Sequence, residues 1–453
     1  MSTTNIIAVR PEPRAVLERR KNEAKDPNRL LKQGVWAYFL LLIFEGALRK
    51  WFLPGLATPL LIIRDPLVVW MLILTWQRGL LPANPYMIGM MLIGILSTFT
   101  AVLVGHGNVA VAIYGARILL LHFPMVFVIG RIFNREDVVK LGKVTLWIAI
   151  PMTVLIALQF YSPQSAWVNR GVGGDMAGAG YSGALNYFRP PGTFSFTSGN
   201  TQFFMFVGCF VFYFWLNSQN MNRLVLIAAT AGLLAAIPMS ISRSLLFGVG
   251  VTMIFTLAAV ARKPQYLSKI IPIGFAMVIA LAVLSQATFF QNATEAFLSR
   301  FTSASETEGG LEGTIGNRYL GGMFAALTGS SNTPFFGYGI GMGTNVGSML
   351  LSGGTQFLIA EEEWARLIGE MGPLFGIIVI FLRVGFCVKV AFACYEKLSV
   401  GDFLPWILLS YGLLMIPQGQ WAQPTALGFS TLIAGLLIAS LRSAPQKRVV
   451  RTS

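Results

Sequence analysis

Charged side chains are scarce in this sequence. Of its 453 residues, 12% are Asp, Glu, Lys or Arg and 55% are hydrophobic, and the mean hydropathy is +0.65. A soluble domain carries about 25% charged residues. The composition therefore excludes an ordinary soluble protein and indicates an integral membrane protein.

Cysteine and histidine are also rare. The three cysteines, Cys209, Cys387 and Cys394, lie in apolar segments, and His106 and His122 stand apart from each other. These numbers and spacings argue against a disulfide framework and a metal cluster, so we expect no cofactor. The sequence contains no Walker loop, GxSxG elbow, HExxH motif or acidic couplet in the first outer loop. ATP-driven transport, metalloproteolysis and metal-dependent sugar transfer therefore lose support.

Apolar runs of about 20 residues, long enough to cross a bilayer, recur along the chain. We predict an all-α polytopic membrane protein with about 12 transmembrane helices and one large extracytoplasmic loop carrying short helices. The predicted spans are 35–53, 56–76, 86–105, 109–131, 138–161, 201–217, 222–239, 244–261, 269–288, 373–395, 403–418 and 425–441.

The basic residues predict an orientation. The formal net charge is +15, but lysine and arginine gather in the two termini and in alternate short connections, which is typical of the cytoplasmic side. We therefore expect both termini in the cytoplasm, contact with membrane lipid, and no nucleic-acid partner. The predicted parts are a basic tail (1–34), transmembrane helices 1–9 (35–290), the large outer loop (291–372), helices 10–12 (373–441) and a second basic tail (442–453).

Four arginines are predicted to lie at the outer surface. They are Arg189, Arg243, Arg318 and Arg366. A guanidinium group stays charged and binds two phosphate oxygens at once, so a convergent set would suit a lipid-linked pyrophosphate. Each one alone could equally extend to lipid headgroups or cap a helix.

The long loop ends on an acidic segment. On a helix Glu362 and Glu363 would share a face with Arg366 and pair with it. A partly desolvated carboxylate here could act as a general base toward a sugar hydroxyl, although a solvated acidic face is the alternative. Trp364 suits a sugar platform, and it equally suits an interfacial anchor.

Charged residues also occur within the predicted spans. Glu45, Arg64, Asp65 and Arg117 are costly there unless they face the bundle interior in pairs. Arg64 and Asp65 are adjacent, so they should point in different directions and pair elsewhere. We predict that Asp65 pairs with Arg117 or Arg49; a path for a lipid phosphate is the alternative.

Several motifs follow one another on the predicted outer face. They are Arg189-Pro-Pro-Gly-Thr-Phe, Ser240-Ile-Ser-Arg-Ser244, Asn317-Arg318 followed by Pro334-Phe-Phe-Gly-Tyr-Gly-Ile-Gly341, and Glu362-x-x-x-Arg366 continuing through Gly376. In order, spacing and placement they resemble the O-antigen ligase and Wzy-type polymerase superfamily of bacterial surface polysaccharide assembly. The resemblance covers most of the chain from the first predicted span onward.

One position departs from that pattern. Ligase members carry a His-Asn pair at the start of the final motif, where this chain has Glu361-Glu362. The histidine that the resemblance implies as the helper of the acceptor hydroxyl is therefore missing. We favour a polymerase over a ligase for this reason.

The resemblance implies inverting, metal-independent polymerisation of polyprenyl-pyrophosphate-linked repeat units on the outer face of the bacterial cytoplasmic membrane. The implied catalytic residues are Glu361, Glu363, Arg243 and Arg318. The implied substrate-binding residues are Arg189, Arg366, Gly337, Gly339, Gly341 and Trp364.

The implied partners are a lipid-linked saccharide donor and acceptor, with a chain-length regulator or flippase as a further candidate.

Three alternative functions stay open. A ligase would move the glycan to a lipid or protein acceptor. A transporter or flippase also suits twelve spans, although transporters usually show duplicated halves and no duplication is visible here. A sensor or scaffold is the third.

Overall fold

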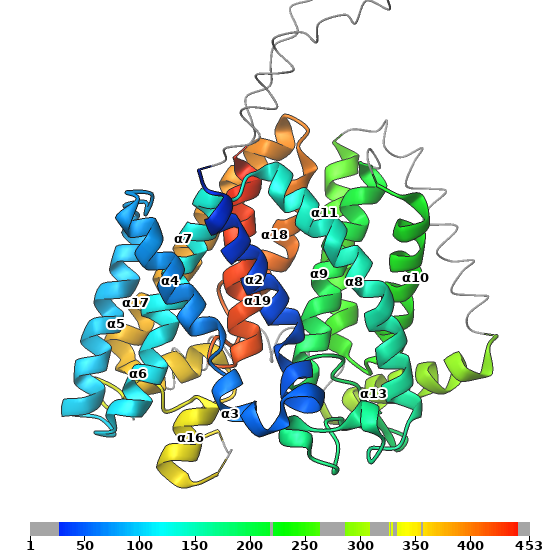
Figure 1. Cartoon of the computed structure of the whole chain (residues 1–453), viewed down its shortest axis with the longest axis horizontal. Coiled ribbons are helices and arrows are strands. Elements are labelled where there is room, and N and C mark those ends of the chain that lie inside the picture. The colour runs from blue at the N-terminus through cyan, green and yellow to red at the C-terminus, as the bar shows by residue number, and fades with distance from the viewer. Residues whose placement is uncertain are drawn as a thin grey trace, which may run out of the picture.

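The computed structural model describes residues 27–217, 221–262, 286–308, 326, 328, 333–354 and 357–442. Most of these residues are helical, and the long helices form one bundle (Figure 1). In the described part of the chain, nine helices are long and apolar enough to cross a membrane. These features are consistent with the predicted all-α membrane protein.

The first half of the bundle matches six predicted spans. Two of the six contain a π-helical segment, and two short helices, η2 (Pro54–Leu56) and α3 (Ala57–Leu60), precede the second of the six. The six are α2 (Arg29–Ala47) with η1 (Leu48–Phe52), α4 (Arg64–Gln77), α5 (Pro85–Leu103), α6 (Val109–Arg117) with η3 (Ile118–His122) and α7 (Phe123–Ile132), α8 (Arg135–Tyr161), and α9 (Thr197–Leu216).

The second half contains five further helices at predicted spans. They are α10 (Arg223–Met239), α11 (Arg243–Ala261), α17 (Glu363–Ser399), α18 (Phe403–Met415) and α19 (Pro424–Leu441). Of these, α10 and α18 are shorter than the nine long helices. The predicted span 269–288 lies mostly outside the described residues.

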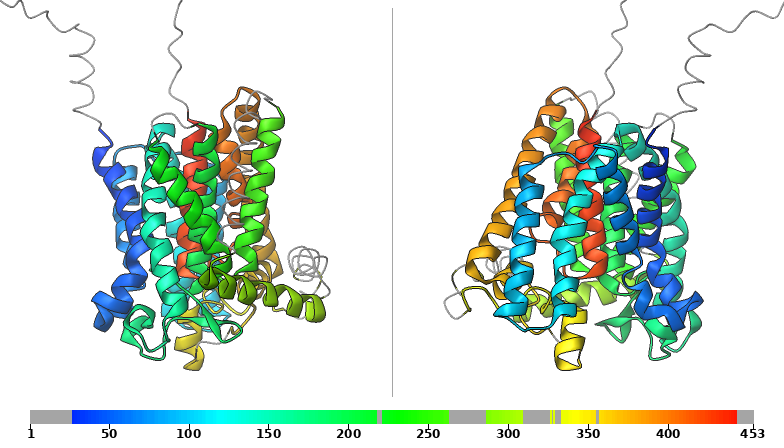
Figure 2. Two further views of the ribbon diagram at one scale, coloured as in Figure 1. Left: turned by 90° about the vertical axis from the view of Figure 1, so that its right-hand side faces the viewer. Right: turned by 60° about the vertical axis from the view of Figure 1, so that its left-hand side comes forward.

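The longer described connections gather at one end of the bundle. α2 begins and α19 ends at the other end, whereas α3, α13 (Thr288–Glu308), α16 (Asn345–Ser352) and the segment 162–196 lie together (Figures 1 and 2). We call this the loop end. The described parts of both predicted outer loops therefore share one side of the molecule.

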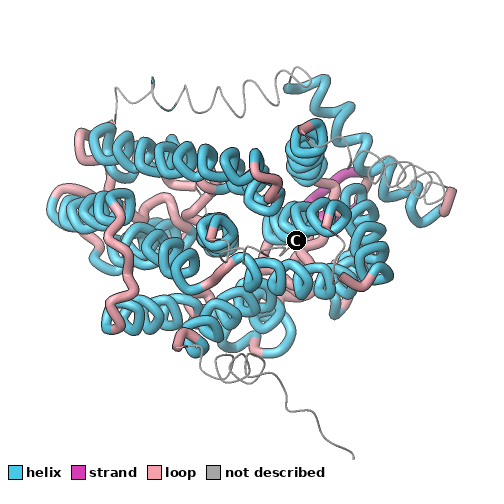
Figure 3. The backbone as a smooth tube through the Cα atoms, turned by 90° about the horizontal axis from the view of Figure 1, so that it is seen from above, coloured by secondary structure: helices cyan, strands magenta, loops and turns pink. Residues whose placement is uncertain are grey.

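A short hairpin lies at the loop end. It pairs β1 (Tyr181–Ala184) with β2 (Tyr187–Arg189), between the 3-10 turns η4 (Trp167–Asn169) and η5 (Val172–Gly174) and α9 (Figure 3). Its turn residues Leu185 and Asn186 have φ of 50° and 65°. The ring of Tyr187 stacks on Phe160 of α8 with centroids 4.6 Å apart. The all-α prediction did not include this hairpin, because its strands are too short for a period-two pattern.

Charged residues inside the bundle form ion pairs, as we predicted from the sequence. Asp65 accepts hydrogen bonds from Arg117 Nη1 at 2.8 and 2.9 Å and lies 2.9 Å from His122 Nε2. Arg64 turns away from Asp65 and pairs with Glu45 at 3.2 Å. The prediction that Asp65 pairs with Arg117, and Arg64 elsewhere, is confirmed.

The Asp65–Arg117 pair yields a stability prediction. Replacing one partner, by Asp65→Leu or Arg117→Met, leaves the other charge buried and should cost about 3–5 kcal/mol of unfolding free energy. The double variant should cost clearly less than the sum of the two, because it leaves neither charge alone. Thermal unfolding of the purified protein in detergent measures all three variants, and strict additivity would contradict the pairing.

Candidate functional site

The turn after Arg189 is anchored to the bundle core. Gly192 has φ of 62°, and a Cβ there would lie 2.9 Å from Met152 Sδ. Its carbonyl accepts from Lys50 Nζ at 2.6 Å and from Gln159 Nε2 at 3.1 Å, and its N–H donates to Gln159 Oε1 at 2.8 Å. These bonds hold the turn, and with it Arg189, against η1 and α8.

Three arginines come together beside this turn. Burial lowers the pKa of Arg189, and the positive charges of Arg300 and Arg243 lower it further, while Tyr181 acts in the opposite direction. The guanidinium group nevertheless stays charged at neutral pH. The buried Nε atoms of Arg189 and Arg300 have no hydrogen-bond partner among the described residues. We call Arg189, Arg243 and Arg300 the outer arginine cluster.

The Ser240–Ser244 motif places Arg243 in this cluster. Ile241 has φ of 47°, a left-handed conformation that a β-branched residue rarely adopts. Its side chain packs against the hairpin, since a Cβ at Gly183 would lie 2.6 Å from Ile241 Cδ1. Ser242 then caps α11 by accepting from Leu245 N at 3.3 Å. The strained turn thus starts α11 at Arg243, next to the strand that ends in Arg189.

Arg366 occupies a different environment. It lies in a buried cluster of four charges, Glu363, Arg366, Glu370 and Arg383. Arg366 Nε and Nη2 donate to Glu363 at 3.1 and 2.9 Å, and its Nη1 donates to Glu370 at 2.5 Å. Arg383 Nη1 donates to Glu363 at 2.6 Å. The two acidic and the two basic side chains neutralise one another. Arg366 therefore has a structural role here and adds no net positive charge to the site.

Arg383 also supports the break between α18 and α19. Its Nε donates to Ile416 O at 2.7 Å, its Nη2 donates to Gly419 O at 3.1 Å, and its guanidinium lies 4.5 Å from the centroid of Trp421. Carbonyl groups outside a helix need such partners where water is excluded. The break at 416–423 is therefore held in one conformation.

The glycine-rich segment packs on neighbouring backbone. Gly337, Gly339 and Gly341 have φ of 72°, 113° and 94°. A Cβ at Gly337 would lie 2.4 Å from Gly372 N, and one at Gly341 would lie 2.1 Å from Val111 O. All three glycines are buried, so their small size is explained by packing, and the predicted contact with substrate stays a prediction.

Gly372 interrupts α17 at the boundary between the predicted outer loop and the next predicted span. Its φ of 73° and ψ of 170° are non-helical. The glycine-rich segment bonds to the turn just before it, with Tyr338 N donating to Gly369 O at 2.8 Å and Gly339 N to Glu370 O at 2.9 Å. Gly343 N also donates to Glu370 Oε1 at 2.7 Å. The kink, the glycine-rich segment and the four-charge cluster therefore form one unit.

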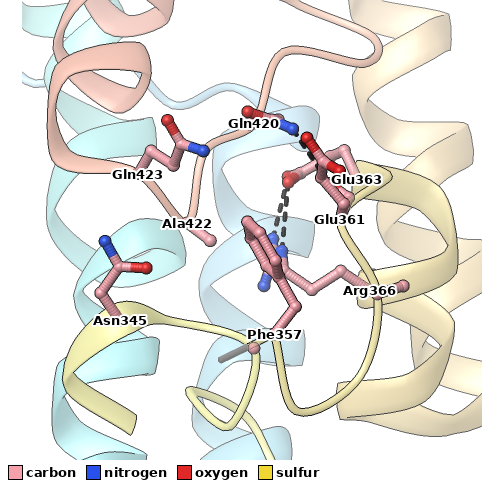
Figure 4. A pocket seen from close by; sticks show the side chains of 10 residues that line it. Asn345, Phe357, Glu361, Glu363, Arg366, Gln420, Ala422 and Gln423 are labelled. Carbon is pink, nitrogen blue, oxygen red and sulfur yellow. Dashed lines mark hydrogen bonds and ion pairs between the residues drawn. The ribbon is translucent and has the colours of Figure 1, made fainter. Parts of the chain in front are cut away.

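A small hollow opens beside this unit at the loop end (Figure 4). Its cavity volume is about 10 Å³, which is room for about one water molecule. It is lined by Gly343, Asn345, Phe357, Ala360, Glu361, Glu363, Arg366, Gln420, Ala422 and Gln423. Binding sites for small molecules usually offer about 300–1,000 Å³, so this hollow as it stands is too small for a sugar ring.

The predicted site residues fall into separate groups. Arg189 and Arg243 come together, and Arg318 lies outside the described residues. Glu361 is exposed at the hollow and Glu363 is buried. Trp364 is only 8% exposed and donates from Nε1 to Pro417 O at 2.9 Å, so its ring is packed inside and unsuited to the sugar platform that we expected.

Some residues of these sites were not among the predicted ones. Arg300 is one of them, and its signal in the sequence was its position within the predicted outer loop 291–372. Arg383 carries a stronger signal, because a charge in the middle of an apolar span is costly and usually paired inside the bundle. Glu370, Gln420 and Gln423 carry no comparable signal.

Comparison of the chain with protein families, with curated proteins and with solved structures finds no match. The likeness to polysaccharide polymerases and ligases therefore depends on the motifs alone.

Gly353 and Gly372 have similar φ values, but their ψ values of 7° and 170° and their surroundings differ. Gly353 has φ of 70° and open space at its Cβ position, whereas a Cβ at Gly372 would lie 2.0 Å from Phe335 O. Gly353→Ala should cost about 1–2 kcal/mol through its backbone conformation alone. Gly372→Ala should lower the melting temperature much further, because the kink and the glycine-rich segment must separate. Equal melting temperatures of the two variants would refute the close contact.

Proposed function

We propose that this protein polymerises polyprenyl-pyrophosphate-linked saccharide repeat units by inverting glycosyl transfer at the outer face of a bacterial cytoplasmic membrane. The bond between the donor's anomeric carbon and the pyrophosphate oxygen breaks. A bond from that carbon to the acceptor hydroxyl oxygen forms on the opposite face. The acceptor proton passes to a base, and polyprenyl pyrophosphate leaves with the electron pair.

The outer arginine cluster is the observation that carries the proposal. The positive charges of Arg243 and Arg300 each act on Arg189, and the buried Nε atoms of Arg189 and Arg300 have no hydrogen-bond partner among the described residues. Positive charges held close together repel one another, and a bound anion would offset that repulsion. A departing pyrophosphate supplies that anion, and fixed cations stabilise it most as its charge develops.

Among the candidate bases, Glu361 fits the role better than Glu363. Two guanidinium groups, those of Arg366 and Arg383, already occupy the Glu363 carboxylate, and its side chain is buried. Glu361 lines the hollow, and its side chain makes no ion pair within the described part of the chain. We therefore assign proton removal from the acceptor to Glu361 in this proposal.

Alanine at each member of the cluster tests the proposal. Arg189→Ala, Arg243→Ala and Arg300→Ala should each lower the transfer rate by about 10²–10³-fold, the usual effect of removing one group that stabilises developing charge. The measurements are polymer formation in a complemented deletion strain and the amount of protein in the membrane.

Arg170→Ala is the matched control, because Arg170 belongs to the same loop and is not among the groups that lower the pKa of Arg189. It should leave polymer unchanged. Normal polymer from all three cluster variants at normal protein level would remove the mechanism.

The lipid-linked intermediates of a deletion strain distinguish the alternatives. A polymerase deletion should accumulate single repeat units on the outer leaflet, and a ligase deletion should accumulate long unattached chains. Repeat units retained on the inner leaflet would indicate a flippase.

With the wild-type protein, transfer should survive excess chelator, since the cluster takes the place of a metal in the proposal.

A further inference from the structure

The connection between α2 and α4 is apolar over its whole length. Residues 51–63 contain no charged side chain. The chain leaves η1, passes through η2 and α3 at the loop end, and enters α4 (Figure 1). We call residues 52–63 the apolar arch. Its most open large side chains, at 67%, 43%, 50% and 41% exposed, are Phe52, Leu53, Leu56 and Ile62. A connection that lies in water is usually polar, so this one calls for an apolar environment.

The helix that follows the arch is too short to cross a bilayer alone. The 14 residues of α4 rise about 21 Å at 1.5 Å each, whereas the hydrocarbon layer is about 30 Å thick. The far end of α4 is fixed, because Arg78 directly after it donates to Pro27 O at 2.7 Å, next to the start of α2. Arg64, at the near end, therefore lies below the surface of the layer, and the arch occupies the missing part of the crossing.

The backbone of the arch is suited to a place without water. At membrane depth, a non-helical backbone must find its hydrogen-bond partners within the protein. Pro54 and Pro59 have no N–H group, and Ala57 O accepts from Arg49 Nε at 2.7 Å. Six further N–H groups donate to carbonyl oxygens of residues 48–60; they belong to Leu53, Leu56, Ala57, Leu61, Ile62 and Ile63.

Arg49 fastens the arch to the bundle. Its guanidinium group is buried beneath the arch, donates from Nη1 to Ser195 Oγ at 2.9 Å, and lies 3.5 Å from the carboxylate of Glu45. The same side chain thus holds Ala57 of the arch and the turn that follows Arg189. The arch is therefore a fixed part of the loop end, and its exposed face has a defined direction.

The exposed face of the arch continues the exposed apolar surface of α4. On α4 that surface includes Val69, Trp70, Ile73 and Trp76. Among the nine candidate spans of the described chain, Pro54–Gln77 is the least buried, with 22% of its most apolar window inside the protein. A helix so little covered by its own bundle presents its side chains to lipid, and the arch extends that surface.

A tryptophan pair marks the edge of this surface. Trp51, just before the arch, stacks on Trp167 with ring centroids 5.5 Å apart, and Trp167 is exposed. Tryptophan is enriched where the hydrocarbon of a membrane meets water. The pair therefore fits the headgroup level beside a lipid-covered arch.

We infer that the apolar arch lies in the hydrocarbon of the leaflet at the loop end, and that its partner is the acyl chains of bilayer lipids. The contacts are made by Phe52, Leu53, Leu56 and Ile62. The inference goes beyond the proposed function and does not depend on it.

Spin labelling of the full-length protein in phosphatidylcholine vesicles tests the inference. A label at Leu56→Cys is exposed to oxygen, which concentrates in hydrocarbon, and to nickel ethylenediaminediacetate, a polar complex that stays in water because desolvating polar groups costs several kcal/mol. The three native cysteines are buried, so the wild-type protein supplies the background.

Two reference positions calibrate the measurement. Ile73→Cys lies on the exposed face of α4, and Ala177→Cys lies in an exposed loop-end segment beside the exposed carboxylate of Asp175. The ratio of oxygen to nickel accessibility at residue 56 should match that at residue 73. It should exceed the ratio at residue 177 by at least about tenfold, a difference of about 1.4 kcal/mol in the partition of the polar complex.

Leu53→Cys repeats the measurement at a second exposed position of the arch, in case the first variant does not fold. A ratio equal to that of Ala177→Cys would place the arch in water and overturn the inference. Low accessibility to both reagents, with an immobilised spectrum, would show that a second copy or another protein covers the arch, and would overturn it as well.

The outcomes are independent of the proposed function. If the cluster variants make normal polymer while the arch gives the lipid ratio, the arch stands and the transfer mechanism fails. If the cluster variants lose polymer while the arch gives the water ratio, the mechanism stands and the inference fails.

Discussion

The ion pair between Arg383 and Glu363 is the interaction on which the loop end depends. A chain that leaves the helical conformation between α18 and α19 exposes carbonyl groups in an apolar bundle, and Arg383 supplies donors to two of them. Burying that guanidinium would be prohibitive without a carboxylate, which Glu363 provides. Glu363 in turn holds Arg366, and Arg366 holds Glu370, which accepts from the glycine-rich segment. This series of contacts sets the shape of the hollow.

Much of the fold could be predicted from the sequence, because long apolar runs admit few structures at membrane depth. The spans and the Asp65–Arg117 pair both follow from the cost of unpaired polar groups. The hairpin could not be predicted in the same way, since three- and four-residue strands carry little pattern. Its position depends on tertiary contacts such as the stacking of Tyr187 on Phe160.

The candidate sites were less predictable, and the arginines show why. Arg366 and Arg243 carry the same charge and both follow recognisable motifs. Arg366 is neutralised by Glu363 and Glu370, whereas the charge of Arg243 acts on Arg189. Which arginine meets a carboxylate depends on packing between segments far apart in the chain. Residue type and spacing predict the side of the membrane, and three-dimensional contacts decide the electrostatic role.

The shortness of α18 has a consequence for water. Its 13 residues rise only about 20 Å at 1.5 Å each, whereas the hydrocarbon layer is about 30 Å thick. The floor of the hollow, formed by the segment after α18, would therefore sit below the level of the lipid headgroups. In the proposed reaction, an activated sugar attacked there would meet few solvent molecules. The depth of the hollow in the membrane would by itself disfavour hydrolysis, the side reaction that competes with every glycosyl transfer.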